Sequence, residues 1–451
     1  MTGNMTKGSP WRTILLFSLP IMAGNLLQQL YNTADSVIVG QFVSQEALGA
    51  VGTCTPLTIL FIALAVGLST GASILVSQLF GAGRQEELRR SVSTALILLT
   101  GLGLLMMGIG VLTARPLLKY ALGVPESVLD LAALYLRVYA LGLVFQFIYN
   151  IVAAILRAVG DSRATLYFLL VSSLVNIILD LIFVAGFHWG VGGAAAATVI
   201  SQGCSAAISV GYMFRKYEAL RFRRGQFQFS REYCLTTLRL GIPVALQQCV
   251  ISMGQLFVQR LVNHYGTEMM GAFTAAVRLE NYVMIPIFGF NAGLNVFVGQ
   301  NVGAQALHRV RKGFRQTVAM SAVFCLTLSL VMLTLGGQIV RIFGLTGNAL
   351  ALGQQYVRCE APFFIVFAVY QVAAATLQGS GDVTFATCCT LESLIVRVIL
   401  SYALAYYTPL DYTAIWWAMC IGWAAGLIPA YLRYFSGAWK KKSLVSGGAA
   451  S

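Results

Sequence analysis

Long apolar segments follow one another along almost the whole chain, and this pattern restricts the fold more than any other feature. Only 10% of the 451 residues are charged, against roughly 25% in a soluble domain. Each segment is long enough to cross about 30 Å of hydrocarbon, and a single span in lipid must be helical to satisfy its own backbone. The sequence predicts twelve spans, at residues 13–40, 48–80, 91–114, 128–158, 163–186, 190–214, 238–264, 270–302, 313–338, 350–378, 384–407 and 412–435.

Basic residues are distributed unevenly between the loops. If the N-terminus is cytoplasmic, the inner loops contain most of the 30 lysines and arginines, including the stretch from Arg215 to Arg239 and the run Lys440–Lys442. The outer loops contain Arg115, Lys119 and Arg341. Positive charge accumulates on the cytoplasmic side of membrane proteins. The net charge of +14 therefore indicates topology rather than a nucleic-acid partner, and both termini are predicted to be cytoplasmic.

The two halves of the chain repeat the same short motifs in the same order. Leu156-Arg-Ala-Val-Gly-Asp161 in the first half corresponds to Leu377-Gln-Gly-Ser-Gly-Asp382 in the second. Ser77-Gln-Leu-Phe-Gly-Ala82 corresponds in the same way to Gly299-Gln-Asn-Val-Gly-Ala304. The offset is nearly the same for both pairs, which indicates duplication of a six-helix unit. Because six is even, both halves enter the membrane in the same orientation, as in transporters built from parallel repeats.

The predicted fold is an all-α integral membrane protein. Its twelve transmembrane helices form two six-helix lobes related by a pseudo-two-fold axis along the membrane normal. The lobes comprise residues 1–214 and 238–451, and residues 215–237 form a basic cytoplasmic linker. The nine cysteines and three histidines show neither metal-ligand spacing nor a nucleophile motif. We therefore expect a protein that is not an enzyme and has no cofactor.

Ionisable side chains inside a membrane span are costly and usually functional. The first half has two such acids, Asp35 in the first span and Asp180 in the fifth. Asn176 precedes Asp180 by four residues, so the two share one helix face. The alternative for each acid is a structural hydrogen bond without a role in transport.

Counting along the helices places several oxygen-bearing side chains at a similar depth. At ~1.5 Å per residue they lie about 8–15 Å below the outer ends of their spans. Carboxylate, amide and hydroxyl oxygens are hard ligands that suit Na⁺. Two neighbouring carboxylates in a low dielectric resist ionising together, so the same group could bind a proton. The residues in this layer are Asp35, Tyr139, Asn176, Asp180 and Thr198.

The second half carries a different set of charges in and around its spans. Opposite charges in a membrane protein can neutralise each other in ion pairs. We expect that structural role here, with contacts to a substrate or gate as the alternative. The residues are Arg260, Arg278, Glu280, Arg358, Glu360, Glu392 and Arg397.

The first span also carries a recognisable motif. Gln28-Gln-Leu-Tyr-Asn-Thr-Ala-Asp-Ser-Val-Ile-Val-Gly40, followed by Glu46-Ala-Leu-Gly-Ala-Val-Gly52, resembles the first-helix signature of multidrug and toxic compound extrusion (MATE) transporters. The stretches 77–83 and 156–161 are similar to the same family, nearest its MepA-like bacterial branch. The resemblance extends from about Trp11 to Phe435. It implies two six-helix lobes, alternating access, and drug efflux driven by H⁺ or Na⁺.

The resemblance further implies which residues couple ion and drug. The first-lobe cation site of the family corresponds here to Asp35, Asn176, Asp180 and Thr198, and the same four residues would hold Na⁺. Tyr139 is a further match and Gln28 is a neighbour. Some relatives carry coupling acids on the seventh and tenth helices. Here the seventh has none before Glu268, and residues 363–375 of the tenth have none. We therefore expect coupling in the first lobe only, at Asp35, Asn176, Asp180 and Thr198.

The function expected from these features is secondary active export of drugs or toxic compounds against H⁺ or Na⁺. The substrates would be lipophilic or cationic small molecules, which the sequence does not identify further. A flippase for lipid-linked oligosaccharides or other amphiphiles, with the same fold and a basic cavity, is the alternative. We expect a monomer in the bacterial inner membrane.

Overall fold

The structure, a computed structural model, describes residues 3–43, 45–221, 227–342 and 345–445. These residues are almost all helical, and no strand occurs among them. The first-half helices are α1 (Pro10–Phe42), α2 (Gln45–Gly81), α3 (Gln85–Pro116), α4 (Glu126–Leu141), α5 (Leu143–Ala158), α6 (Ser162–Asp180) and α7 (Gly190–Lys216). The second-half helices are α8 (Arg231–His264), α9 (Thr267–Gly303), α10 (Leu307–Ile342), α11 (Gly347–Glu360), α12 (Phe364–Ser380), α13 (Val383–Tyr407) and α14 (Thr413–Ser436).

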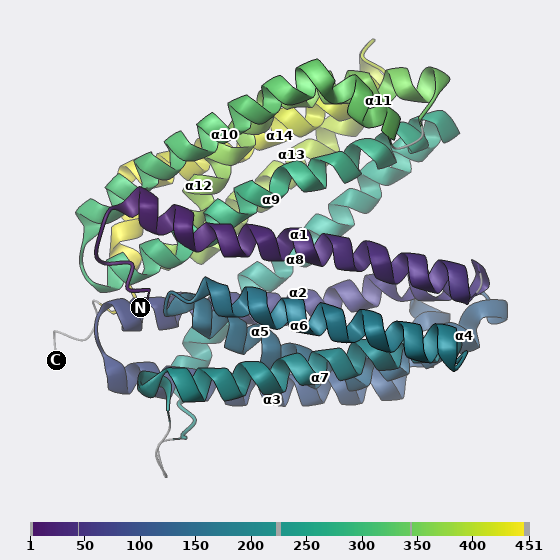
Figure 1. Ribbon diagram of the computed structural model, residues 1–451. Coiled ribbons are helices and arrows are strands. Elements are labelled where there is room, and N and C mark those ends of the chain that lie inside the picture. Colours follow the sequence, from purple (N-terminus) through teal and green to yellow (C-terminus); the bar gives the residue numbers. More distant parts are fainter. Residues whose placement is uncertain (1–2, 44, 222–226, 343–344, 446–451) are drawn as a thin grey trace. The chain divides into compact units, whose positions relative to one another are not determined.

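Short segments of other helix types extend or link several of the helices that are labelled in Figure 1. Two π-helical segments, η1 (Leu117–Ala121) and η2 (Leu181–Gly186), continue α3 and α6. Three 3₁₀ segments are η3 (Glu218–Leu220), η4 (Ala361–Phe363) and η5 (Ala438–Lys442). Because Pro362 in η4 cannot donate a backbone hydrogen bond, the predicted tenth span is interrupted between α11 and α12.

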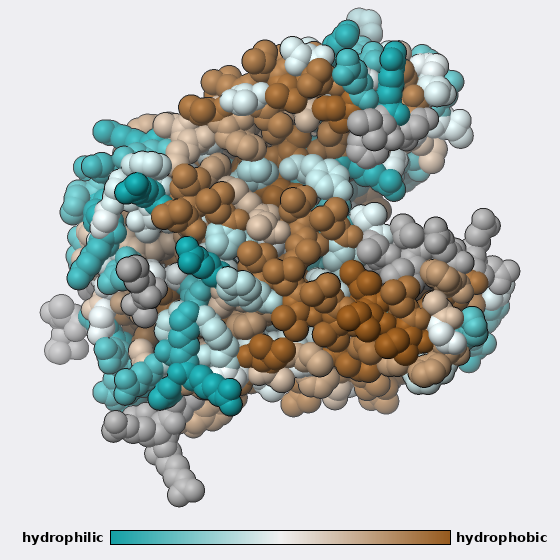
Figure 2. All heavy atoms as spheres, viewed as in Figure 1, coloured by the Kyte–Doolittle hydropathy of each residue, from teal (hydrophilic) through white to brown (hydrophobic). Residues whose placement is uncertain are grey.

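The predicted twelve spans are confirmed. Among the described residues, eleven helical stretches are long and apolar enough to cross a membrane, and α4 with α5 makes a twelfth that is bent by 45°. Apolar residues lie along the flanks of the helices, and hydrophilic residues gather at their ends (Figure 2). Leu112 on α3 is 79% exposed and Leu330 on α10 is 63% exposed. Large apolar side chains exposed in this number are typical of a surface covered by lipid.

Contacts within the chain divide it into two units. Unit 1 is centred on Ala23–Leu246, and unit 2 comprises Met5–Met22 and Gln247–Ser451. The first part of α1 therefore packs within unit 2, and the first part of α8 packs within unit 1. Both helices pass from one unit to the other shortly after a proline, Pro20 in α1 and Pro243 in α8. The contact units thus differ from the predicted lobes, which followed chain order alone.

Each unit has its own apolar core. In unit 1, α4 contributes fully buried side chains such as Leu129 and Leu136 to a cluster with α2 and α3. In unit 2, the largest fully buried side chain is Trp416 of α14, which packs with Phe273 and Tyr356. Because lipid is itself apolar, such packing stabilises each bundle through van der Waals contact rather than by removing apolar surface from water.

Two glycines of α2 allow an unusually close helix crossing within unit 1. A Cβ atom at Gly67 would lie 2.5 Å from the backbone nitrogen of Ala245, and one at Gly71 would lie 2.5 Å from that of Gly241. Both neighbours belong to the first part of α8. The spacing of four residues places the glycines on one face, which is the small-residue pattern that lets membrane helices approach.

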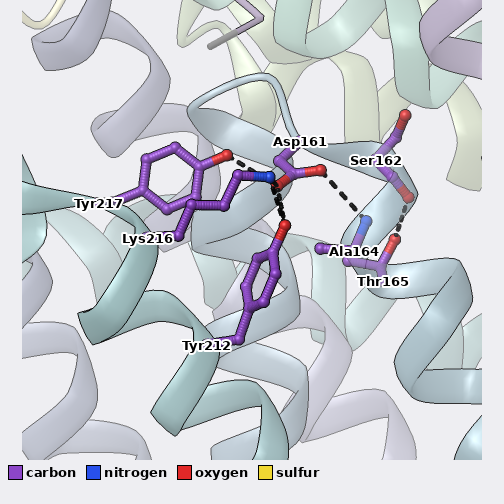
Figure 3. Close-up of polar contacts among 7 residues, drawn as sticks. All are labelled: Asp161, Ser162, Ala164, Thr165, Tyr212, Lys216 and Tyr217. Atoms are coloured by element: carbon purple, nitrogen blue, oxygen red, sulfur yellow. Dashed lines mark hydrogen bonds and ion pairs between the residues drawn. The ribbon is translucent and has the colours of Figure 1, made fainter. Parts of the chain in front are cut away.

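The acid that ends the first-half repeat motif joins two helices (Figure 3). Asp161 caps α6 by accepting the backbone N–H of Ala164 at 3.1 Å. Its other oxygen accepts from the hydroxyls of Tyr212 at 2.9 Å and Tyr217 at 2.7 Å, and from Lys216 Nζ at 2.9 Å. The carboxylate therefore ties the start of α6 to the end of α7.

The equivalent acid of the second half uses a different partner. Asp382 precedes α13 and accepts from Arg433 Nε of α14 at 2.7 Å, and the Arg433 guanidinium lies 4.7 Å from the centre of the Phe385 ring. Arg433 and Tyr212 both lie 51 residues after their acids. The two halves therefore share the position of this aspartate contact. The partner groups differ, because phenols and an ammonium group bind Asp161 whereas a guanidinium binds Asp382.

Substitution of Asp161 by asparagine is expected to destabilise unit 1 by about 2 kcal/mol, because it removes charge-assisted bonds from a carboxylate that is 8% exposed. Burial raises the pKa of Asp161, but the bonds from Tyr217, Lys216, Ala164 and Tyr212 outweigh it and hold the pKa below its ordinary value. The stabilisation is thus present above the unfolded-state pKa and is lost as the pH falls through the folded-state pKa.

Thermal unfolding of the purified protein in detergent, followed over pH, measures this contribution. Asp161→Asn should lower the midpoint at neutral pH, and the difference from the parent should shrink in acid. Glu218→Gln, at an exposed glutamate of η3, is the matched control and should leave the midpoint unchanged. Equal midpoints for Asp161→Asn and the parent at neutral pH would contradict the assignment.

Candidate functional site

Two of the predicted site residues lie on the last turns of α6. Asn176 is 1% exposed and Asp180 is 0% exposed. The i, i+4 spacing places both on the face of α6 that packs against α7. The π-helical segment η2 begins directly after Asp180. Such local widening of a helix is frequent at functional sites, because it changes the direction of the following side chains.

The Asn176 amide connects three helices. In the orientation that satisfies both ends of the amide, its nitrogen donates to Asp180 Oδ2 at 2.8 Å and to the hydroxyl of Tyr31 at 3.3 Å. Its oxygen accepts from the backbone N–H of Thr198 at 3.1 Å. Tyr31 lies on α1 and Thr198 on α7, and all of these residues belong to unit 1. A buried carboxylate, an amide and a phenol therefore meet around one point.

Thr198 contacts the Asn176 amide through its backbone N–H. It is half-buried, and its hydroxyl donates to the carbonyl of Ala194 one turn earlier at 3.0 Å. The hydroxyl oxygen still has lone-pair capacity after this donation. The predicted set of Asn176, Asp180 and Thr198 is thus brought together by the fold.

The other predicted residues have different positions. Tyr139 is 7% exposed on α4, and the bond that its hydroxyl makes within the described part of the chain goes to Gln146 Oε1 at 3.4 Å. Gln28 is half-buried on α1, three residues before Tyr31 and on the same side of the helix. Asp35 falls within α1, but its side chain lies outside the part of the structure that is described.

Tyr31 is the residue that the sequence reasoning missed. It stands in the quoted first-helix motif, four residues before Asp35. That spacing predicts a shared helix face, which is a signal that could have identified it. A tyrosine in a membrane span is nevertheless common, so the residue type alone gave no reason to select it.

The charges of the second half do not pair as expected. Among the described residues of that half, the ion pair within 4.0 Å is the one between Asp382 and Arg433. In the described part of the chain, the seven charged residues of the second-half spans form no direct ion pair within 4.0 Å, so the predicted direct pairs are not formed, although Arg397 interacts electrostatically with Glu280 and Glu360. Several of them, including Arg278, Arg358 and Glu392, are exposed on the surface of the protein.

Comparison with known proteins agrees with this architecture. A sequence model of the MatE family matches the chain twice, at residues 20–182 and 243–403. The spacing between the starts of the two matches is close to the offset of the internal repeat. One family unit therefore occurs once in each half.

Relatives in sequence and in structure match most of the length of this chain. The probable multidrug resistance protein YoeA of Bacillus subtilis is 27% identical over 98% of this chain and 97% of its own length. The multidrug export protein MepA of Staphylococcus aureus is 24% identical over 75% of this chain and 74% of its own. A solved multidrug resistance MATE family transporter of the MOP superfamily, in an outward-facing conformation, superposes with a TM-score of 0.90 at 26% identity, covering 97% of this chain and 98% of its own. Since the family unit accounts for both halves and the structural match covers nearly every residue, this chain belongs to the MatE family of membrane transporters.

Proposed function

We propose that this protein exports organic, often cationic, drugs or toxic compounds in exchange for H⁺ or Na⁺, with the ion bound at Asp180. The observation that carries the proposal is the Asn176 amide, which holds one oxygen of a fully buried carboxylate in place between α1, α6 and α7. A carboxylate in such a position requires a proton or a cation to offset its charge.

The chemistry of the site supports either ion. One donor fixes Asp180 Oδ2, while the oxygens of Asp180, Tyr31 and Thr198 can face a bound cation. We include Asp35 in the site, because it follows Tyr31 by one helical turn in sequence. Ion binding then offsets the charge of the site, and ion release restores it. This change in charge would alter the free-energy difference between the conformations of the transporter, and so would bias alternating access.

The names of the relatives support the substrate class. YoeA and MepA are named for multidrug resistance and multidrug export, and we extend that class to this chain. We also propose, from the distribution of basic residues, that both termini are cytoplasmic in a bacterial inner membrane. We further propose a monomer without an organic cofactor.

Efflux from liposomes containing the purified chain tests this function. A fluorescent organic cation such as ethidium is loaded, and a pH gradient or a Na⁺ gradient is imposed separately. We expect one of the two gradients to drive transport above the passive leak, and that gradient identifies the coupling ion. If neither gradient moves the dye or other lipophilic cations, the proposal is wrong. Liposomes without protein provide the control.

A further inference from the structure

A cluster in unit 2 combines a buried glutamate, Glu360, with a glutamate and an arginine that are half-buried, Glu280 and Arg397. Glu280 lies on α9, Tyr356 and Glu360 lie on α11, and Arg397 lies on α13. Glu360 is 0% exposed and Tyr356 is 2% exposed. The Tyr356 hydroxyl donates to Glu280 Oε2 at 3.1 Å. Three helices thus bring their titratable side chains to one place inside the apolar core.

Two members of this cluster, Glu360 and Arg397, have buried polar atoms without a hydrogen-bond partner among the described residues, and Arg397 has one such atom, Nε. Neither carboxylate oxygen of Glu360 accepts a hydrogen bond from the described part of the chain. Tyr356 also faces Glu360, but the single hydroxyl proton is directed to Glu280. Glu360 is the last residue of α11, where the helix dipole disfavours a negative charge. An ionised carboxylate is therefore poorly stabilised at this position.

The charges around the two glutamates do not balance. Arg397 is the cation that interacts electrostatically with both of them among the described residues. The other titratable groups that face Glu360 are uncharged when protonated: the Tyr356 phenol and the thiols of Cys359 on α11 and Cys420 on α14.

Within the described part of the chain, the remaining elements around the cluster contribute no further charge to it. On α10, the Ser329 hydroxyl donates to the carbonyl of Ala361. On α14, Trp416 and Met419 are 1% exposed and contribute apolar surface. The arginines nearest in sequence, Arg278 and Arg358, are exposed. Two acidic groups therefore face one guanidinium in a setting where an uncompensated charge is strongly disfavoured.

We propose that Glu280 and Glu360 share one proton, which makes this cluster a proton-binding site of unit 2. With the proton bound, one carboxylate offsets Arg397, the other is a neutral acid, and the cluster has no net charge. The acid form also gains a donor, so one oxygen of the pair can bond to the other carboxylate. The site is separate from Asp180 in unit 1. It also lies outside the seventh helix and residues 363–375, the places at which some relatives carry coupling acids.

Infrared spectroscopy of the purified full-length protein tests this charge balance directly, because a protonated carboxyl has a carbonyl stretching band distinct from that of a carboxylate. Spectra of variants are compared with that of the parent at neutral pH, and a shift of the band in D₂O identifies it as a carboxylic acid. Acids elsewhere, including Asp180, contribute equally to both spectra and cancel in the difference.

The proposal predicts a definite band count. Glu280→Gln and Glu360→Gln should each remove one carboxylic acid, since the remaining glutamate then pairs with Arg397. Arg397→Gln should add one carboxylic acid, because both glutamates must then be protonated. The carboxylic-acid band from the cluster should therefore be about twice as strong as in the parent. Arg397→Lys keeps the charge and should match the parent. Survival of the full band in either glutamate variant would overturn the proposal.

Two controls keep the result interpretable. Glu392→Gln changes an exposed glutamate of α13 and should leave the spectrum unchanged. Size-exclusion profiles report whether each variant is folded, and if Arg397→Gln fails to fold, the two glutamate variants and Arg397→Lys still decide the question. Because the measurement requires no transport, its failure is distinguishable from failure of the exchange proposed at Asp180.

Discussion

Asp180→Asn should reduce ion-driven dye efflux to the passive leak of liposomes without protein. Asparagine has nearly the same shape as aspartate, and its side-chain oxygen can still accept the bond that Asn176 donates at 2.8 Å. The fold is therefore expected to persist. What disappears is the ability of the side chain to change charge, and without it the ion gradient has no means of biasing the transporter.

The measurement is efflux of ethidium under whichever gradient drives the parent protein, together with binding of the dye to the detergent-purified variant. Binding should persist while driven efflux is lost. Asp130→Asn provides a matched control, since Asp130 is a first-half aspartate whose side chain is 79% exposed at the start of α4. It should transport as the parent does. Undiminished driven efflux by Asp180→Asn would remove Asp180 from the coupling mechanism.

Gly71→Leu should prevent stable folding of unit 1, with a loss of at least about 3 kcal/mol. A Cβ atom at this position would lie 2.5 Å from the backbone nitrogen of Gly241 and 2.7 Å from the carbonyl oxygen of Thr237. Both atoms belong to the backbone of α8, so no side-chain rotation can relieve the overlap. The helices would have to separate and lose the contacts between them.

Expression yield, size-exclusion profile and thermal midpoint in detergent measure this effect. Gly101→Leu is a close control, because Gly101 lies in α3 of the same unit and a Cβ there meets no atom within 4 Å. That variant should resemble the parent in all three measurements. A monodisperse Gly71→Leu protein with the parent's midpoint would show that the crossing of α2 and α8 is looser than the structure indicates.

The second half contains the equivalent glycine pair at the equivalent helix contact. Gly289 and Gly293 of α9 are the repeat equivalents of Gly67 and Gly71. Their nearest neighbours are side-chain atoms of α1, Met22 Cγ and Ser18 Oγ, each 2.3 Å from an added Cβ. Ser18 and Met22 occupy the positions in α1 that Gly241 and Ala245 occupy in α8, so the same helix contact occurs in both halves, with side-chain atoms in place of backbone atoms.

The sequence was sufficient for features that depend on local periodicity. Twelve spans follow from the length of the apolar segments, and the duplication follows from a nearly constant offset between motifs. Asn176 and Asp180 could be placed together because an α-helix brings residues four apart onto one face. Hydrophobic length and helical repeat are properties of one segment, so they can be read without knowing the neighbours of that segment.

Partners on different helices were decided by the tertiary structure. Tyr31 reaches the Asn176 amide, Asp161 binds two tyrosines and a lysine where Asp382 binds an arginine, and Tyr356 donates to Glu280. These pairings depend on the distance and rotation between helices to within the length of a hydrogen bond. Helical periodicity gives the face of a side chain but leaves the opposing helix and its depth undetermined. The sequence by itself thus determined a duplicated twelve-span membrane protein with acids in its first half. Packing between helices determined which groups share a hydrogen bond.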